Sequence, residues 1–122
     1  MTTIQPSPHD RLTIECHIHG DSGIRVVSAN GELDADVCPL LEAALHAKDG
    51  LQPPRVVVDL SGVTFMDSSG INLFANAYQT LTSAGGWLRI AAPTGPVHRV
   101  LSLVGLDTVI TCHPTLDNAL TA

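Results

Sequence analysis

The segment that decides the fold reads Arg55-Val56-Val57-Val58-Asp59-Leu60-Ser61-Gly62-Val63-Thr64-Phe65-Met66-Asp67-Ser68-Ser69-Gly70. Its β-branched residues predict a buried strand that ends at Asp59 and is followed by a short loop. A helix is expected next, because apolar residues recur at helical spacing at Ile71, Phe74, Ala75, Tyr78 and Leu81. Asp67-Ser68-Ser69-Gly70 should therefore lie at a helix N-terminus, which has unpaired N–H donors and a partial positive charge. Such a terminus can hold a phosphate on serine.

The rest of the chain alternates predicted strands and helices around this segment. Residues 12–18 alternate as in a half-buried strand, and 24–29 are typical of the returning strand of a hairpin. A helical stripe covers 37–45, with Asp34 or Asp36 available as its N-cap and Gly50 as its end. After the helix at 69–83 we expect strand 87–91, helix 96–105, strand 108–111 and a short helix over 114–120. The order ββαβαβαβα predicts an α/β fold with a mixed, largely parallel sheet flanked by helices and an antiparallel N-terminal strand.

Composition narrows the class of protein. The chain has 122 residues, of which 44% are hydrophobic, enough for the core of a single domain over 11–122 behind a polar N-terminal tail at 1–10. A formal net charge of −6 without a basic cluster argues against a nucleic-acid partner. No apolar run reaches the roughly 18–20 residues of a membrane span, and no signal peptide is evident, so we expect a cytoplasmic protein that does not bind membranes. Cys16, Cys38 and Cys112 are expected to be free thiols.

Ser68 and Ser69 allow two interpretations. Either hydroxyl can simply cap the helix by accepting a hydrogen bond from a backbone N–H. Against this, Asp67 can cap the helix by itself, and Gly70 leaves space for a partner's backbone or a nucleotide to approach. The site also follows the carboxyl end of a strand, the edge at which open α/β sheets bind ligands. A phosphate on Ser68 would add roughly −1.5 to −2 charges and change a partner-binding surface without refolding.

The helix after the serines carries a polar stripe of Asn72, Asn76 and Gln79. Such a stripe is either a solvated helix face or part of a binding surface. Because this helix begins at the candidate phosphate site, we expect Asn72 and Asn76 to touch the partner. Leu73 lies between the polar and apolar faces and is expected to be an exposed apolar contact.

Other chemistry finds little support in the sequence. His17 and His19 share one side of a strand, but no third ligand is evident, so a solvated face is favoured over a metal site. The sequence has no Gly-x-Ser-x-Gly elbow, phosphate loop or HExxH motif, so neither a cofactor nor an enzymatic activity is expected.

In two motifs the chain resembles a STAS domain, specifically a bacterial anti-sigma factor antagonist. One motif is the strand–loop–helix unit that ends in Asp67-Ser68-Ser69-Gly70. The other is Gly31-Glu32-Leu33-Asp34, which ends the second predicted strand just before the first helix. The resemblance covers about 12–120, in the same order of elements, and implies a STAS-like fold.

The resemblance also implies a partner-switching mechanism. In that family the unphosphorylated protein binds an anti-sigma factor, a serine kinase with a histidine-kinase-like ATP site, and the sigma factor is released to start transcription. The kinase phosphorylates the first serine of the motif, here Ser68, with Ser69 as the second candidate, and a metal-dependent serine phosphatase restores the active form. Asp34 matches an acidic position near the phosphoacceptor, while Asp67, Ser69 and Gly70 complete the expected partner-binding surface. The protein would then be a substrate of these enzymes and catalyse nothing.

Two alternatives stay open at this point. One is a constitutive STAS scaffolding subunit of a transporter or stress-signalling complex, which the intact Asp-Ser-Ser-Gly motif disfavours. The other is a weak nucleotide hydrolase that uses the helix terminus as a phosphate cradle. The acidic balance and the lack of a Lys-bearing phosphate loop disfavour it.

Overall fold

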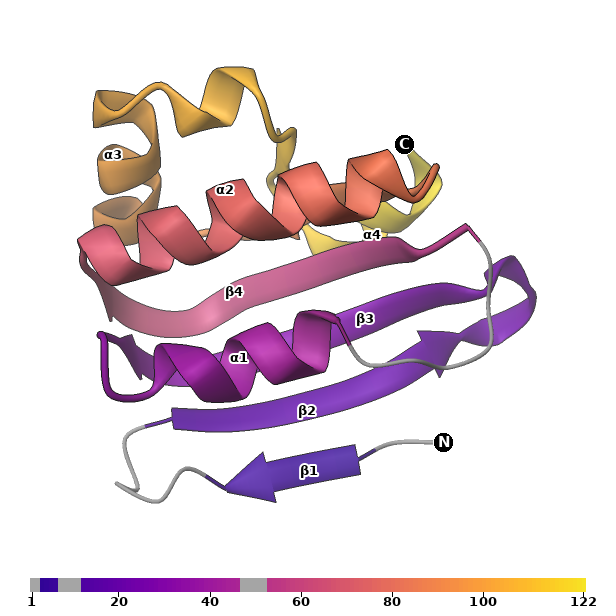
Figure 1. The fold of residues 1–122 in the computed structure, drawn as a ribbon, viewed down its shortest axis with the longest axis horizontal. Helices are drawn as coiled ribbons and strands as arrows, with labels where there is room; N and C mark the ends of the chain where they lie inside the picture. Colours follow the sequence, from indigo (N-terminus) through magenta and orange to yellow (C-terminus); the bar gives the residue numbers. More distant parts are fainter. Residues whose placement is uncertain (1–2, 7–11, 47–52) are drawn as a thin grey trace.

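The computed structural model describes residues 3–6, 12–46 and 53–122 (Figure 1). Within these ranges, six strands form one sheet in the order β1-β2-β3-β4-β5-β6. The strands are β1 (Thr3–Pro6), β2 (Leu12–His19), β3 (Ile24–Leu33), β4 (Arg55–Met66), β5 (Trp87–Ala91) and β6 (Cys112–His113). The helices are α1 (Cys38–Leu45), α2 (Ser68–Ser83), α3 (Gly95–Leu103) and α4 (Leu116–Thr121), with 3₁₀ turns η1 (Gly20–Ser22) and η2 (Leu106–Thr108).

The sheet is mixed, and its parallel part consists of β3, β4, β5 and β6. β1 pairs antiparallel with β2, and β2 antiparallel with β3. The pairs β3–β4, β4–β5 and β5–β6 are all parallel. The predicted fold class, a largely parallel sheet flanked by helices, is confirmed. The parallel order brings the carboxyl ends of β3, β4 and β5 to one edge of the sheet, and α2 begins there directly after β4.

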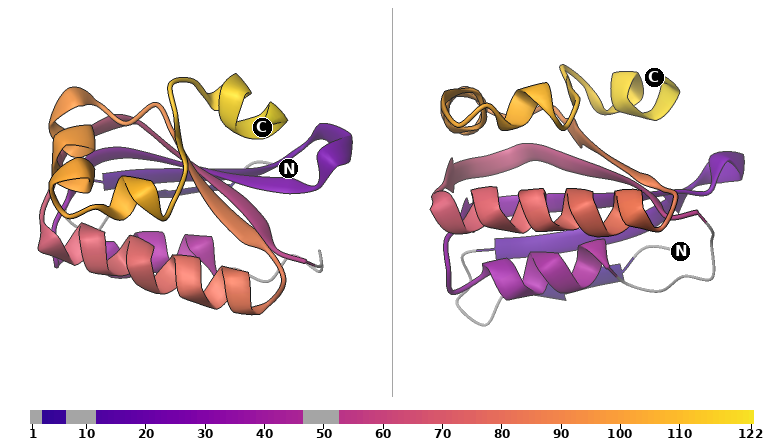
Figure 2. Two further views of the ribbon diagram at one scale, coloured as in Figure 1. Left: turned by 90° about the horizontal axis from the view of Figure 1, so that it is seen from above. Right: turned by 45° about the horizontal axis from the view of Figure 1, so that its top comes forward.

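The helices cover the sheet unequally. α1 and α2 lie side by side on one face, and the short α4 lies on the other (Figure 2). The larger core lies between the sheet and α1 and α2 and includes the buried residues of α3. Its fully buried members include Leu12, Ile14, Leu33, Leu41, Leu60 and Phe74. A smaller cluster forms on the α4 face from Ile24, Val57, Ala91 and Ala119. In the described part of the chain, no helix is both long and apolar enough to cross a membrane.

β4 is longer than the sequence predicted, since the loop expected after Asp59 does not exist. The strand continues through Ser61 and Gly62 to Met66, and two register shifts against β3 absorb the irregularity. At Gly62 the Asn30 side chain of β3 lies close over the β4 backbone, because a Cβ there would be 1.8 Å from its side-chain oxygen. A serine and a glycine, which usually punctuate a loop, here belong to an irregular strand.

The prediction of a polar tail over 1–10 is corrected in part. Thr3–Pro6 form β1, whose register against β2 runs from Thr3↔Cys16 to Pro6↔Thr13. The pairing is physically reasonable, because β2 without it would be an edge strand with a row of unpaired backbone groups.

The predicted strand over 108–111 is wrong. The chain forms η2 up to Thr108, and β6 consists only of Cys112 and His113, which pair with Ile90 and Ala91. The β-branched residues of this segment suggested a strand, but Gly105 ends α3 in a left-handed conformation and turns the chain into η2.

The capping prediction for the first helix is also wrong. α1 begins at Cys38 with Val37 as its N-cap, and no side chain caps it. The Asp34 carboxylate instead accepts a hydrogen bond from the Asp36 N–H at 3.1 Å, in the turn before the helix. Gly50, the predicted end of the helix, lies outside the described residues.

Candidate functional site

The N-terminus of α2 is held by Asp67. The Asp67 N–H donates to the Leu33 carbonyl at 3.2 Å, which ties the end of β4 to the end of β3. The Asp67 carboxylate caps the helix by accepting from the Ser69 N–H at 2.9 Å. The cap is therefore a carboxylate, as the sequence allowed, and neither serine hydroxyl is needed for it.

Ser68 is the first residue of α2, and its side chain is exposed. Its hydroxyl makes no hydrogen bond among the described residues. Ser69 is partly buried and contributes its backbone N–H to the cap. Of the two serines, Ser68 thus presents the more accessible hydroxyl at a terminus whose N–H donors and dipole favour an added anion.

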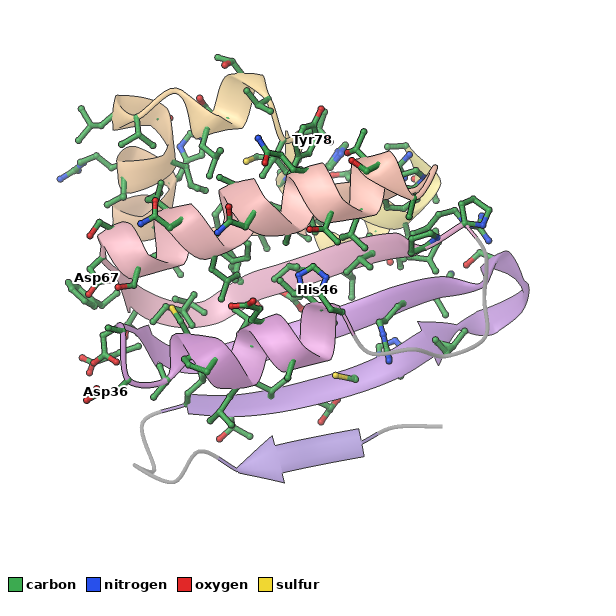
Figure 3. All side chains as sticks on the ribbon, viewed as in Figure 1. Asp36, His46, Asp67 and Tyr78 are labelled. Carbon is green, nitrogen blue, oxygen red and sulfur yellow. The ribbon has the colours of Figure 1, made fainter. Side chains whose placement is uncertain are left out.

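Asp34 lies at the same edge of the sheet as Asp67. It follows the last residue of β3, whose register partner on β4 is Met66, the residue before Asp67. Its carbonyl accepts from the N–H groups of Val37 and Cys38 and so starts the turn into α1. Figure 3 shows Asp36, in this turn, and Asp67 at the same end of the molecule. The structure therefore brings the two predicted acidic positions, from β3 and β4, to one edge.

The pKa of the Cys38 thiol is shifted by the acidic residues of this edge. It is buried, with 7% of its surface exposed, and burial is the main cause that raises its pKa from 9.0 to about 11. The carboxylates of Asp67, Asp34 and Glu42 raise the pKa further, in that order. The field of both Asp34 and Asp67 thus reaches the first residue of α1, and the thiol stays protonated at neutral pH.

The role expected for Gly70 is wrong. Gly70 is buried, so it offers no surface to a partner or a nucleotide. A Cβ at this position would lie 2.3 Å from Cγ and 2.8 Å from Sδ of Met66. The absence of a side chain serves internal packing, because it lets the Met66 side chain lie against the first turn of α2.

The prediction that Leu73 is an exposed contact is also wrong. Leu73 is 5% exposed and belongs to the core between α2 and the sheet. The buried face of α2 consists of Gly70, Leu73, Phe74, Ala77 and Leu81, so the true stripe is rotated relative to the predicted one. Asn72 and Asn76 are exposed on the same helix and remain available to a partner.

One residue of this edge was not predicted as part of the site. Phe65, near the end of β4, has 47% of its surface exposed. Its neighbour Met66 is buried, and side chains alternate along a strand, so Phe65 lies on the opposite face of the sheet from Met66. Strand alternation could have predicted that Phe65 and Met66 point to opposite faces. From the sequence, a loop is expected in this segment, and side chains do not alternate regularly in a loop.

The described residues contain no group of three or more His, Cys, Asp or Glu side chains that could hold a metal ion. His17 and His19 lie on β2, partly buried and exposed, respectively. The three cysteines are free thiols.

Comparison with known proteins places this arrangement in a family. A family model described as a STAS domain matches residues 16–119. An anti-sigma F factor antagonist from Paenibacillus polymyxa is 31% identical over 111 residues, which cover 90% of this chain and 93% of that protein. The anti-sigma-F factor antagonist RsfB from Mycobacterium tuberculosis is 30% identical over 115 residues, which cover 94% of this chain and 92% of that protein.

A solved structure agrees with these relatives. The crystal structure of an anti-sigma factor antagonist from Mycobacterium paratuberculosis is similar with a TM-score of 0.79 and 36% identity, and the match covers 96% of this chain and 97% of that chain. The chain therefore belongs to the STAS domain family.

Proposed function

We propose that this protein is an anti-sigma factor antagonist whose binding to an anti-sigma factor is switched off by phosphorylation of Ser68. The observation that carries the proposal is the exposed, unused hydroxyl of Ser68 at a helix N-terminus that Asp67 already caps. The names of the relatives support the antagonist role, since the two relatives and the solved structure described above are named anti-sigma factor antagonists.

The geometry favours a switch that leaves the fold intact. A phosphate on Ser68 adds roughly −1.5 to −2 charges at neutral pH. The cap formed by Asp67 and the Ser69 N–H does not involve the Ser68 side chain, so α2 keeps its N-terminus. The positive end of the helix partly offsets the new charge, while Asp67 opposes it. The surface around Ser68 thus becomes more negative and more bulky, and a partner fitted to the unmodified surface loses affinity.

The binding surface is proposed to lie around this helix terminus. It includes Asp34 and Asp67 at the edge of the sheet, Ser69 in the first turn, and Asn72 and Asn76 on the exposed face of α2. Gly70 and Leu73 are excluded, because both are buried. The surface belongs to a single domain whose sheet includes β1 at Thr3–Pro6, and the proposed place of action is the cytoplasm.

The proposed partner is an anti-sigma factor that is itself a serine kinase with a histidine-kinase-like ATP site. It phosphorylates Ser68, and a serine phosphatase removes the phosphate. The protein described here supplies a substrate hydroxyl and a docking surface to these enzymes and is not itself the catalyst.

The test measures the dissociation constant between the purified protein and candidate anti-sigma factors from the same genome. Ser68→Asp should weaken binding by at least about tenfold, because it places a bulkier, unpaired carboxylate next to that of Asp67, where the interface is fitted to a neutral hydroxyl. Ser83→Asp is the matched control, since it puts the same charge on an exposed residue at the other end of α2 and should change the constant by less than about twofold. Equal binding of the wild-type protein and Ser68→Asp would overturn the switch and favour a constitutive scaffolding subunit.

A further inference from the structure

Phe65 is an exposed aromatic side chain in a chain that has few aromatic residues. The sequence contains two Phe, one Trp and one Tyr. Phe74 is fully buried and Trp87 and Tyr78 are partly buried, whereas Phe65 has 47% of its surface exposed. Aromatic residues are enriched in the buried core of protein interfaces relative to the rest of the surface. An aromatic side chain at the edge that carries Ser68 therefore calls for a physical explanation.

The position of Phe65 relative to Ser68 is fixed by the end of β4. Phe65 lies three residues before Ser68, and its register partner on β3 is Glu32, whose side chain is also exposed. Met66 packs toward α2, as its closeness to Gly70 shows, so Phe65 points to the other face of the sheet. Phe65 and the start of α2 are thus two sides of one corner at the end of β4.

We infer that Phe65 is the apolar anchor of the partner-binding surface, and that the partner grips the end of β4 from both sides. One part of the partner contacts the N-terminus of α2 around Ser68. Another part passes over the end of β4 and covers Phe65 beside Glu32. This inference rests on the proposed function and extends its surface to the sheet face opposite α1 and α2.

The charge distribution identifies the chemistry of the segment that covers Phe65. Arg25, Arg55 and Arg89 lie at or near the starts of β3, β4 and β5, at the far edge of the sheet. The carboxyl edge instead carries acidic residues that follow or end the same strands, namely Glu32, Asp34, Asp36 and Asp67. The complementary occupant is a segment of the anti-sigma factor with an apolar side chain flanked by Lys or Arg.

The inference also explains how one phosphate can release a whole partner. Burial of an aromatic side chain supplies binding energy only while the partner is seated closely enough to exclude water. A phosphate on Ser68, three residues away along the chain, prevents this close approach. The apolar contact is then lost together with the polar contacts around the helix terminus.

The experiment compares dissociation constants for the anti-sigma factor between the wild-type protein and Phe65→Ala. Val109→Ala is the matched control, because Val109 is 51% exposed and lies just after η2, outside this corner. Phe65→Ala should weaken binding by about tenfold or more, and Val109→Ala by less than about twofold. Phe65→Leu keeps an apolar side chain, so its dissociation constant should lie between those of Phe65→Ala and Val109→Ala. Circular dichroism at the assay temperature establishes that each variant is folded. If Phe65→Ala is not folded, Phe65→Leu serves as the test, and a dissociation constant raised by at least about threefold over wild type supports the anchor.

The outcomes separate this inference from the function on which it rests. If the wild-type protein binds and Phe65→Ala binds equally well, the anchor is overturned while the proposed function stands. If the wild-type protein binds none of the candidate anti-sigma factors, the proposed function itself fails, and the anchor fails with it.

Discussion

Gly70→Ala should destabilise the protein, although alanine is the better helix former. The substitution adds a Cβ that would lie 2.3 Å from Cγ and 2.8 Å from Sδ of Met66, well inside the about 3.5–4.0 Å at which carbon atoms pack. Met66 is 4% exposed, so its side chain has little room to move away. Overpacking of this kind costs about 1–3 kcal/mol, and the helix propensity of alanine returns at most about 1 kcal/mol. The middle of the overpacking range less this return leaves a net loss of about 1 kcal/mol.

Thermal unfolding followed by circular dichroism measures this loss. For a chain of this length, a loss of about 1 kcal/mol lowers the melting temperature by roughly 4 °C. The matched comparison uses Met66→Ala, which removes the two clashing atoms and which by itself costs about 2–5 kcal/mol. In that background, Gly70→Ala should be neutral or stabilising. The anti-sigma factor should bind folded Gly70→Ala as well as it binds the wild-type protein, because Gly70 is buried.

Two results would refute this reasoning. If Gly70→Ala is as stable as the wild-type protein, the Met66 contact does not restrict the site. If the single variant and the Met66→Ala, Gly70→Ala pair show strictly additive losses, the two side chains are not coupled. Either result would favour the alternative role of Gly70, which is to leave space for a partner to approach the serines.

Further predictions concern stability, reactivity and binding. Asp67→Ala should cost about 0.5–2 kcal/mol in a urea unfolding experiment, because it removes the cap on the Ser69 N–H; Asp67→Asn should retain most of the stability, and equal losses would contradict the capping role. Leu73→Ala should cost about 2–5 kcal/mol by the same measurement, since Leu73 is 5% exposed, and a loss below about 0.5 kcal/mol would return it to the surface. Cys38 should resist alkylation at pH 8, measured by peptide mass spectrometry, because its pKa is about 11; modification as fast as that of free cysteine would contradict the assigned environment. The same shift means that the unfolded chain loses this proton first, so the contribution of Cys38 to stability is present below about pH 9 and is lost as the pH rises toward about 11.

The sequence predicted best those elements that have strong local boundaries. β5 begins and ends where predicted, at Trp87 and Ala91, because Gly85-Gly86 precedes it and Pro93 follows closely. The start of α2 was also predicted, since Asp67 supplies a cap directly before a helical stripe. Failures came where tertiary contacts override local signals. β4 runs through Ser61 and Gly62 because β3 offers a pairing partner, and no local rule predicts that pairing.

The candidate site was predicted as a set of positions but not in its packing. Ser68, Asp34 and Asp67 were placed together from the motifs, and the structure brings them to one edge. Gly70 was expected at the surface because it leaves space beside the serine hydroxyls, and Leu73 because the apolar stripe of α2 was predicted from Ile71 to Leu81 without it. In the structure the buried stripe of α2 includes Leu73 and Phe74. Because successive residues point in different directions around a helix, a shift of the stripe by one residue turns a predicted surface position into a core position.

The central claim is that Ser68 is the phosphoacceptor, and mass spectrometry tests it most directly. The protein is incubated with ATP and each candidate anti-sigma kinase, with Ser68→Ala and Ser69→Ala as parallel samples. The account predicts that the wild-type protein and Ser69→Ala each gain one phosphoryl group and that Ser68→Ala gains none. Peptide fragmentation should assign the phosphate to Ser68. Phosphorylation of Ser68→Ala to the same extent as the wild-type protein, or no phosphorylation by any kinase that binds the protein, would contradict it.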